Sequence, residues 1–321
     1  MNVFRNSTWI AWAENIALAF IISLAFYSIL PVNTHFPTEK KLSISKGATA
    51  RSIISQLNTS GYDVGFIDAL ILSKMGNMCQ GEVRFKTPML NRIDFLYQLT
   101  QAKIPLFKIM LIPGETKEIF LSQVANKLDI NTSKLLNAYN LYAKYPEAGI
   151  FADTYLVPKK MNESKLIKFL VSSSEKRYQN ISTKIYGDYN QTQWHKILTI
   201  ASIIQKEAAN KKEMPLVSSV IYNRLKKHMR LQMDGTLNYG KYSHIKVTPQ
   251  RIQTDRSSFN TYKHKGLPDS PIGSVGIHAI QAALHPAKTN YLYFMRNKKG
   301  VHDFSDNFKK HRRNIMKVKT K

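Results

Sequence analysis

The chain has 321 residues, of which 43% are hydrophobic, so it can bury the cores of two modest domains. Its 47 lysines and arginines against 21 aspartates and glutamates give a formal net charge of +26. That balance indicates a polyanionic neighbourhood, namely nucleic acid, anionic lipid or an acidic cell-wall polymer, and charge alone does not choose among them. The single cysteine, Cys79, excludes an intramolecular disulfide and is expected to be a small buried residue.

Residues 9–30 form an apolar run of 22 residues, WIAWAENIALAFIISLAFYSIL, which is long enough to cross a bilayer as a helix. Glu14 interrupts it near one end, and Trp9 and Trp12 fit an aromatic belt. Because no small-x-small cleavage site follows, we expect an uncleaved anchor rather than a signal peptide. Residues 1–8 are then a short cytoplasmic end, since the positive-inside rule does not count long translocated domains.

After a proline-punctuated linker at residues 31–41, two segments share one pattern, residues 42–57 and 111–128. Each predicts a short strand, a G-x-T turn and an amphipathic helix. Thr49 and Thr116 are the expected helix N-caps. Between and after them, we expect a strand at 81–85, helices at 94–99, 132–141 and 166–178, a loop at 187–193 and a solvated basic tail at 309–321.

The most informative stretch is a helix that carries one carboxylate on its apolar face. At about 100° per residue, this face contains Ile197, Ile200, Ala201, Ile203, Ile204 and Ala208. Glu207 lies inside it, about 20° from Ile200. Burial favours the protonated carboxyl and raises its pKa, which is how a general acid is made. The alternative is that Glu207 reaches water at the helix end or pairs with Lys211.

A second amphipathic helix is predicted after Pro215, which suits a first helical turn. Its apolar residues are Leu216, Val217, Val220, Ile221 and Leu225. The polar turn 230–236 follows. A helix pair leading into a polar loop is expected to form one wall of a cleft.

The sequence resembles the MltG-type (YceG-like) endolytic murein transglycosylases through five motifs in order. They are Ala201-Ser202-Ile203-Ile204-Gln205-Lys206-Glu207, Ile221-Tyr222-Asn223-Arg224-Leu225, Leu231-Gln232-Met233-Asp234, Phe259-Asn260-Thr261-Tyr262 with Gly266-Leu267-Pro268, and His285-Pro286-Ala287-Lys288-Thr289 before Tyr291-Leu292-Tyr293-Phe294. The chain departs from the family at Gly235, where proline is usual, and at Gln205, where an acidic residue is usual.

This resemblance implies an α+β protein with a transmembrane anchor, a LysM-like membrane-proximal region at 42–149 and a catalytic domain at 150–321. It implies cleavage of the β-1,4 bond between N-acetylmuramic acid and N-acetylglucosamine within nascent peptidoglycan strands, with 1,6-anhydromuramic ends. Glu207 corresponds to the catalytic glutamate, and the expected substrate-binding residues are Gln232, Asp234, Asn260, Tyr262 and His285. The implied site is on the outer face of the cytoplasmic membrane, beside peptidoglycan synthases.

The sequence lacks the motifs of metal-dependent and cofactor-dependent enzymes. The nine histidines show neither H-E-x-x-H nor paired-cysteine spacing, so we expect no metal, and no organic cofactor is implied. Two alternatives stay open: a non-catalytic cell-wall-binding or divisome scaffold with this fold, and a membrane-surface protein that binds nucleic acid or acidic lipid through its lysines. We expect no nucleic-acid partner.

Overall fold

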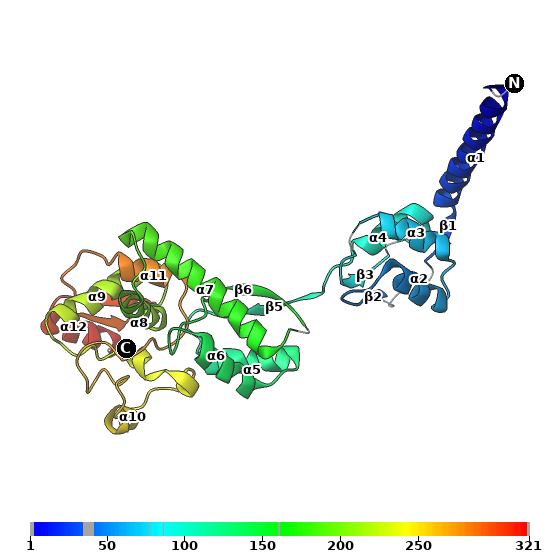
Figure 1. The fold of residues 1–321 in the computed structure, drawn as a ribbon. Coiled ribbons are helices and arrows are strands. Elements are labelled where there is room, and N and C mark those ends of the chain that lie inside the picture. The colour runs from blue at the N-terminus through cyan, green and yellow to red at the C-terminus, as the bar shows by residue number, and fades with distance from the viewer. Residues whose placement is uncertain (1–2, 35–41, 77, 86, 160, 320–321) are drawn as a thin grey trace. The chain divides into compact units, whose positions relative to one another are not determined.

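The computed structural model describes residues 3–34, 42–76, 78–85, 87–159 and 161–319. The chain divides into two compact units, Met1–Leu106 and Phe107–Lys321 (Figure 1). All sheets among the described residues have two strands, and helices supply most of the packing. The mixed α+β class expected from the sequence is confirmed.

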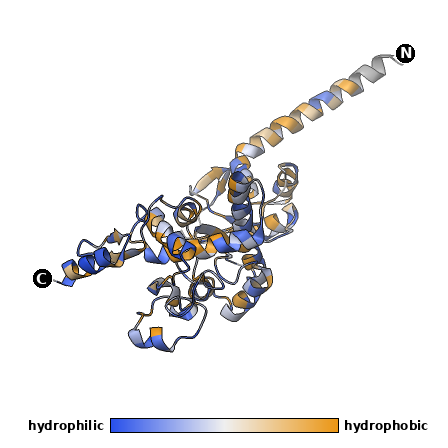
Figure 2. Ribbon diagram, turned by 90° about the vertical axis from the view of Figure 1, so that its left-hand side faces the viewer, coloured by the Kyte–Doolittle hydropathy of each residue, from blue (hydrophilic) through white to orange (hydrophobic). Residues whose placement is uncertain are grey.

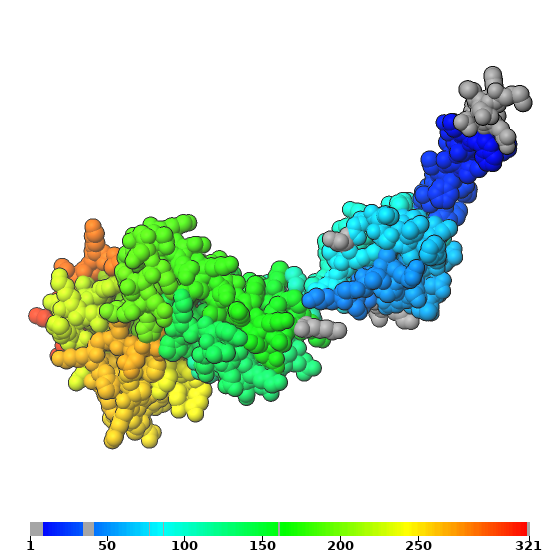
Figure 3. Space-filling model, viewed as in Figure 1, coloured from blue at the N-terminus to red at the C-terminus, as the bar shows by residue number. Residues whose placement is uncertain are grey.

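The first unit begins with the long apolar helix α1, Val3–Ile29. Its stretch Trp9–Ile29 is long and apolar enough to cross a membrane, and none of its most apolar window is buried inside the protein. Figure 2 shows this helix as predominantly hydrophobic, and in the space-filling view it projects from the first unit without a covering segment (Figure 3). The predicted apolar helix is therefore confirmed.

The rest of the first unit is a small α+β module. Strand β1, Pro31–Asn33, pairs antiparallel with β4, Met89–Asn91, and β2, Leu42–Ile44, pairs antiparallel with β3, Gly81–Val83. Its helices are α2, Ala50–Thr59, α3, Phe66–Lys74, and α4, Arg92–Thr100. Their inner faces share one apolar core, which includes Ile53, Leu72, Phe95 and Leu99.

Two details of this module differ from expectation. Pro31–Asn33 is a strand, so the segment after α1 does not begin as a free linker, and residues 35–41 lie outside the described residues. Cys79 is exposed and lies outside the regular elements, in the segment before β3, so the expectation of a buried cysteine is wrong. The predicted cap is confirmed: Thr49 accepts a hydrogen bond from the backbone of Ser52 in a capping box.

The second unit opens with strand β5, Leu106–Met110, which pairs with β6, Thr154–Pro158. Helices α5, Lys117–Leu128, α6, Thr132–Tyr142, and α7, Glu163–Tyr186, pack beside them. Residues from 109 to 171 share one core that includes Phe120, Leu135 and Leu170. Residues 107–149 therefore pack with the segment that follows them, in a compact unit that begins at Phe107. The expected domain boundary near 150 stays a prediction.

The two similar strand-turn-helix segments consequently lie in different units. Residues 42–57 belong to the first and residues 111–128 to the second. Thr116 begins α5, but its hydroxyl makes no cap and instead donates to the carbonyl oxygen of Gly240 at 3.0 Å. This segment thus contributes to the packing around the C-terminal part of the chain.

The remaining elements of the second unit follow in chain order: α8, Gln191–Glu207; α9, Met214–Lys226; the 3-10 helices η1, Asp234–Leu237, and η2, Gly240–Tyr242; α10, Pro249–Thr254; α11, Ile277–Leu284; β7, Tyr293–Arg296; β8, His302–Ser305; and α12, Phe308–Lys319. Strands β7 and β8 are antiparallel. Pro215 lies in the first turn of α9, as predicted. The expected basic tail is the helix α12, which contacts both strands and has no buried residue.

A buried carboxyl holds the start of α5. Glu147 is only 8% exposed, and its Oε1 accepts a hydrogen bond from the backbone nitrogen of Lys117 at 2.9 Å. Burial, with the nearby Glu118 as a second cause, raises the pKa of Glu147 to about 8. Desolvation therefore outweighs the backbone N–H donor that would favour the charged form.

The raised pKa of Glu147 predicts a pH-dependent stability. Its contribution is complete below the ordinary carboxyl pKa of 4.5 and is lost as the pH rises through about 8, with a slope of about 1.4 kcal/mol per pH unit between them. We expect the unfolding free energy of Glu147→Gln to fall less than that of the wild type between pH 5.5 and 8.5, as measured by urea titration. The exposed control Asp269→Asn should keep the wild-type slope, and equal slopes for all three proteins would contradict the assignment.

Candidate active site

Helix α8 is the central helix of another apolar core of the second unit, which contains buried residues from Tyr145 to Ala283. It packs against α9 and α11 (Figure 1). All the predicted apolar residues of its face from Ile197 to Ile204 are buried, and Trp194 at its first turn is fully buried. The predicted residues Ile197–Ile204 are confirmed as core, but Thr199 and Ser202 are buried as well, so this part of α8 is enclosed on all sides, and Ala208 lies just after the helix. Glu207 is the last residue of this helix, so its position is fixed by the whole packed length.

The Glu207 carboxyl is held by one backbone donor. The N–H of Gly235 donates to Oε1 at 2.6 Å. Burial raises the pKa of Glu207 to about 7, and Asp234 adds to the rise, while the Gly235 hydrogen bond and Arg224 oppose it. No described ion pair joins Glu207 to Lys211, which is exposed. The side chain remains partly exposed and is therefore both accessible and able to hold a proton near neutral pH.

Gly235 is fitted closely to that carboxyl. A Cβ at this position would lie 2.7 Å from Glu207 Oε1 and 3.1 Å from Lys206 Cβ. Proline, the usual residue of the resembled family here, would also lack the N–H that Glu207 accepts. The departure noted in the sequence thus supplies the donor that positions the carboxyl.

Three predicted site residues lie on the loop and turn beside Glu207. The Tyr262 hydroxyl donates to Asp234 Oδ1 at 2.6 Å, which joins the η1 loop to the turn after α10. Gln232 is exposed, with φ +47°, a left-handed backbone conformation that is uncommon for a residue other than glycine. Asp234 is also exposed, so these polar groups border the carboxyl without filling its surroundings.

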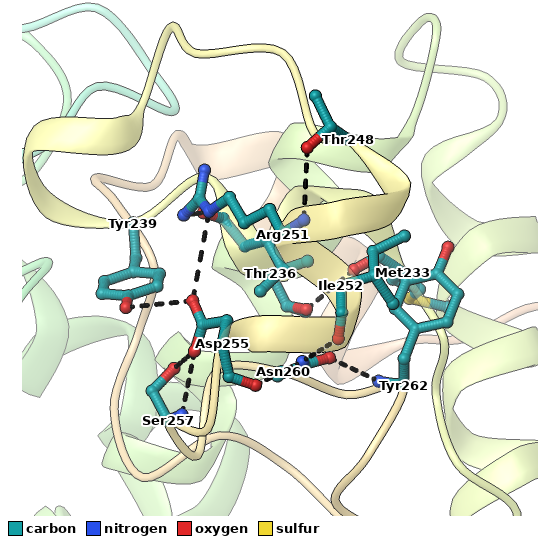
Figure 4. A network of polar contacts seen from close by, with 11 residues as sticks. Met233, Thr236, Tyr239, Thr248, Arg251, Ile252, Asp255, Ser257, Asn260 and Tyr262 are labelled. Atoms are coloured by element: carbon teal, nitrogen blue, oxygen red, sulfur yellow. Dashed lines mark hydrogen bonds and ion pairs between the residues drawn. The ribbon is translucent and has the colours of Figure 1, made fainter.

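Asn260 is not placed to touch a ligand. It is fully buried, and its amide donates to the carbonyl oxygens of Ile252 and Asp255, both at 2.8 Å, while its Oδ1 accepts from the Tyr262 backbone (Figure 4). Within these turns an amide can satisfy three backbone groups, which is why Asn260 stabilises the turn. His285 is exposed beyond α11, and no described contact joins it to Glu207.

Two basic residues of the quoted motifs organise the site, although they received no role from the sequence. Burial lowers the pKa of Lys206 to about 8, and its Nζ donates to the carbonyl of Asn238 and to Ser243 Oγ. Arg224 is 7% exposed and donates to backbone carbonyls, including that of Leu292 at 2.6 Å. Two features of the sequence could have indicated these roles. Lys206 directly precedes Glu207, and Arg224 lies in the motif before the polar turn 230–236.

The loop around η2 is also tied to the start of α5. Besides the Thr116 hydrogen bond to Gly240, Glu115 Oε2 lies 2.7 Å from His244 Nε2. The Gly114 backbone pairs with Ser274, which precedes α11. Residues 114–116 therefore support the site, although the sequence predicts them in the membrane-proximal region.

A methyl group at residue 235 is expected to displace the carboxyl. In Gly235→Ala the new Cβ meets Glu207 Oε1, the flexible end of a side chain, so the carboxyl rather than the backbone should move. A displacement of about 1 Å can reduce turnover about 10²-fold. We expect that loss in any reaction that depends on the Glu207 carboxyl, with a melting temperature close to that of the wild type.

Asn260→Ala is the matched control for that experiment. Removal of its buried amide should lower stability by about 1–2 kcal/mol and leave turnover per folded molecule unchanged. Gly235→Ala should therefore lose turnover and keep stability, whereas Asn260→Ala should lose stability and keep turnover. Normal turnover by Gly235→Ala would contradict the positioning role of the glycine.

Known proteins match this chain in sequence and in fold. It is 33% identical over 197 residues to an endolytic murein transglycosylase of Bacillus subtilis, over 60% of this chain and 53% of that protein. It is 28% identical over 219 residues to one of Streptococcus pneumoniae, over 62% of this chain and 39% of that protein. The crystal structure of a YceG-like protein from Listeria monocytogenes has a TM-score of 0.58 at 24% identity and covers 85% of this chain and 98% of its own, which shows the shared fold.

The matched part is about half, or less, of the length of these curated relatives. The YceG-like family itself matches residues 42–317, a range that leaves out α1 and β1 and includes every residue of the site. This chain belongs to the YceG-like family.

Proposed function

We propose that this protein is an endolytic murein transglycosylase that cleaves the β-1,4 bond from N-acetylmuramic acid to N-acetylglucosamine and so ends glycan elongation. The observation that carries the proposal is the Glu207 carboxyl, which is accessible, held by Gly235 and has a pKa of about 7. A group with that pKa can both donate and accept a proton at neutral pH. The names of the relatives in Bacillus and Streptococcus support the same activity.

The chemistry needs only one titrating side chain. The Glu207 carboxyl donates its proton to the glycosidic oxygen, and the bond from that oxygen to the muramic acid C1 breaks. The resulting carboxylate takes the proton of the muramic acid 6-hydroxyl as its oxygen bonds to C1. This returns Glu207 to its acid form and leaves a 1,6-anhydro end without consuming water. Because the nucleophile belongs to the substrate, its effective concentration replaces a positioned water.

The substrate contacts that we propose are Gln232, Asp234 and Tyr262. Gln232 and Asp234 are exposed on the loop that carries Gly235, and Tyr262 is hydrogen-bonded to Asp234. We assign Asn260 to the turn instead, since its amide is buried. A cleft role for His285 and glycan binding by the LysM-like region 42–149 stay predictions. Peptidoglycan synthases remain the expected protein partners.

The proposal includes a single-pass anchor with its amino terminus inside and the Glu207 site on the outer face of the cytoplasmic membrane. We expect the mature protein to keep Met1 or Asn2, and protease added outside spheroplasts to digest most of the chain. Mass spectrometry of the purified protein identifies its amino terminus, and immunoblots of the digest show which part of the chain the protease removes. An amino terminus processed near residue 30 would refute the anchor, and a protected C-terminal part would refute the orientation.

Glu207→Gln tests the catalytic assignment. It keeps the shape of the side chain but removes its titrating proton, and general acid-base catalysis contributes about 10²–10⁴ in rate. Activity of the variant on uncrosslinked glycan should fall by a factor of at least about 10², and its melting temperature should equal that of the wild type. Since the raised pKa leaves the donating form populated mainly below pH 7, wild-type kcat/KM should fall by about tenfold per pH unit above it.

The products distinguish this mechanism from its competitors. Wild-type fragments should carry 1,6-anhydromuramic ends, which are lighter by one water than the reducing ends left by a hydrolase. Reducing ends would indicate a muramidase with a second carboxylate, for which Asp234 is the first candidate. Unchanged product formation by Glu207→Gln would refute the assignment and favour the non-catalytic scaffold.

A further inference from the structure

Helix α3 is apolar on the side that faces away from its own core. Its sequence, FIDALILSK, has six apolar residues in nine, whereas a surface helix normally carries them on one face only. Asp68, Ala69 and Leu72 are buried in the first unit. Phe66, Ile67 and Leu70 are exposed by 70%, 44% and 53%, and we call these three residues the α3 apolar face.

This face lies at the end of the candidate membrane span. The Tyr27 hydroxyl, two residues before α1 ends, donates to Asp68 Oδ2 at 2.9 Å. Arg92 donates to the same Oδ2 at 2.8 Å and to the Tyr27 hydroxyl at 2.9 Å. The Asp68 side chain is fully buried and that of Arg92 is 4% exposed. The start of α3 is thereby bonded to the last turn of α1.

The bonds limit how far the α3 apolar face can lie from the end of α1. The Cα atoms of Phe66 and Ile67 lie within about 8 Å of that of Asp68 along the chain, and Tyr27 lies about 3 Å before the end of α1. β1 begins at Pro31 and pairs with β4, which adds a second attachment immediately after the span. If α1 crosses the bilayer, the start of α3 with Phe66 and Ile67 therefore lies close to the membrane surface, whichever side of the membrane carries it.

We propose that the α3 apolar face inserts into the interfacial layer of the lipid bilayer beside the end of α1. This inference rests on the proposed membrane anchor. Lipid is the occupant that the position favours, because the bilayer surrounds the end of a spanning helix and takes up an apolar helix face at its surface. Helix α4, which contacts both α1 and α3, also exposes Ile93 and Tyr97, and tyrosine is favoured at this interface. The α+β module of the first unit is thus in contact with the membrane surface and is not merely linked to it through α1.

The depth of single nitroxide labels tests the proposal in the full-length protein. In a Cys79→Ser background, cysteines are placed at Phe66, Ile67 or Leu70 and labelled after reconstitution into vesicles of phosphatidylethanolamine and phosphatidylglycerol. Leu18→Cys, near the middle of α1, is the lipid reference. Ser55→Cys, exposed on α2 of the same module, is the water reference. Power saturation with oxygen and with a water-soluble nickel chelate measures the depth of each label.

We expect labels on the α3 apolar face to collide more with oxygen and less with nickel than the label at residue 55, at a shallower depth than residue 18. A lipid signal at residue 18 with water-like labels on α3 would overturn the inference and leave the anchor standing. A water-like label at residue 18 would overturn the anchor and this inference with it. Shielding of the α3 labels from both reagents would mean that protein, not lipid, covers the face, and would also overturn it.

Discussion

The burial of one carboxyl at the C-terminal end of α8 is the constraint on which the site depends. The packing that makes α8 a core helix also removes much of the water around Glu207, which stays partly exposed, and the partial negative charge of a helix C-terminus further disfavours its ionised form. The Gly235 N–H acts in the opposite direction. The resulting pKa of about 7 is a balance between packing, which protonates the group, and one hydrogen bond, which orients it.

The raised pKa of Glu207 requires that the basic side chains near its carboxyl form no ion pair with it. Arg224 and Lys206 are near it, yet the hydrogen bonds of Arg224 go to the carbonyls of Arg230, Leu231 and Leu292. Lys206 donates to Asn238 and Ser243. A direct ion pair with either residue would lower the pKa of Glu207, so that its carboxyl would be mostly deprotonated near neutral pH. The basic side chains thus hold the loops in place and leave Glu207 unpaired with them.

The loops beside Glu207 receive their shape from residues far away in sequence. Thr116, Glu115 and Gly114 fix the η2 loop and the segment before α11, while Asn260 closes the turn that presents Tyr262. These contacts explain why residues 107–149 pack with the site. A loop that contacts a substrate needs such support, because its own short helices bury little apolar surface.

Apolar periodicity and local turn residues predicted α1, the α8 and α9 pair, the Thr49 cap and the position of Glu207 at the end of the α8 core, because each depends on spacing within one helix. Asn260 and Tyr262 are two residues apart in an irregular turn, where no period tells which side chain is buried. Likewise, the Gly235 contact, the role of Lys206 and the packing division near residue 106 join segments distant in the chain. Only tertiary structure decided them, since loop closure and long-range hydrogen bonds leave no regular pattern in the sequence.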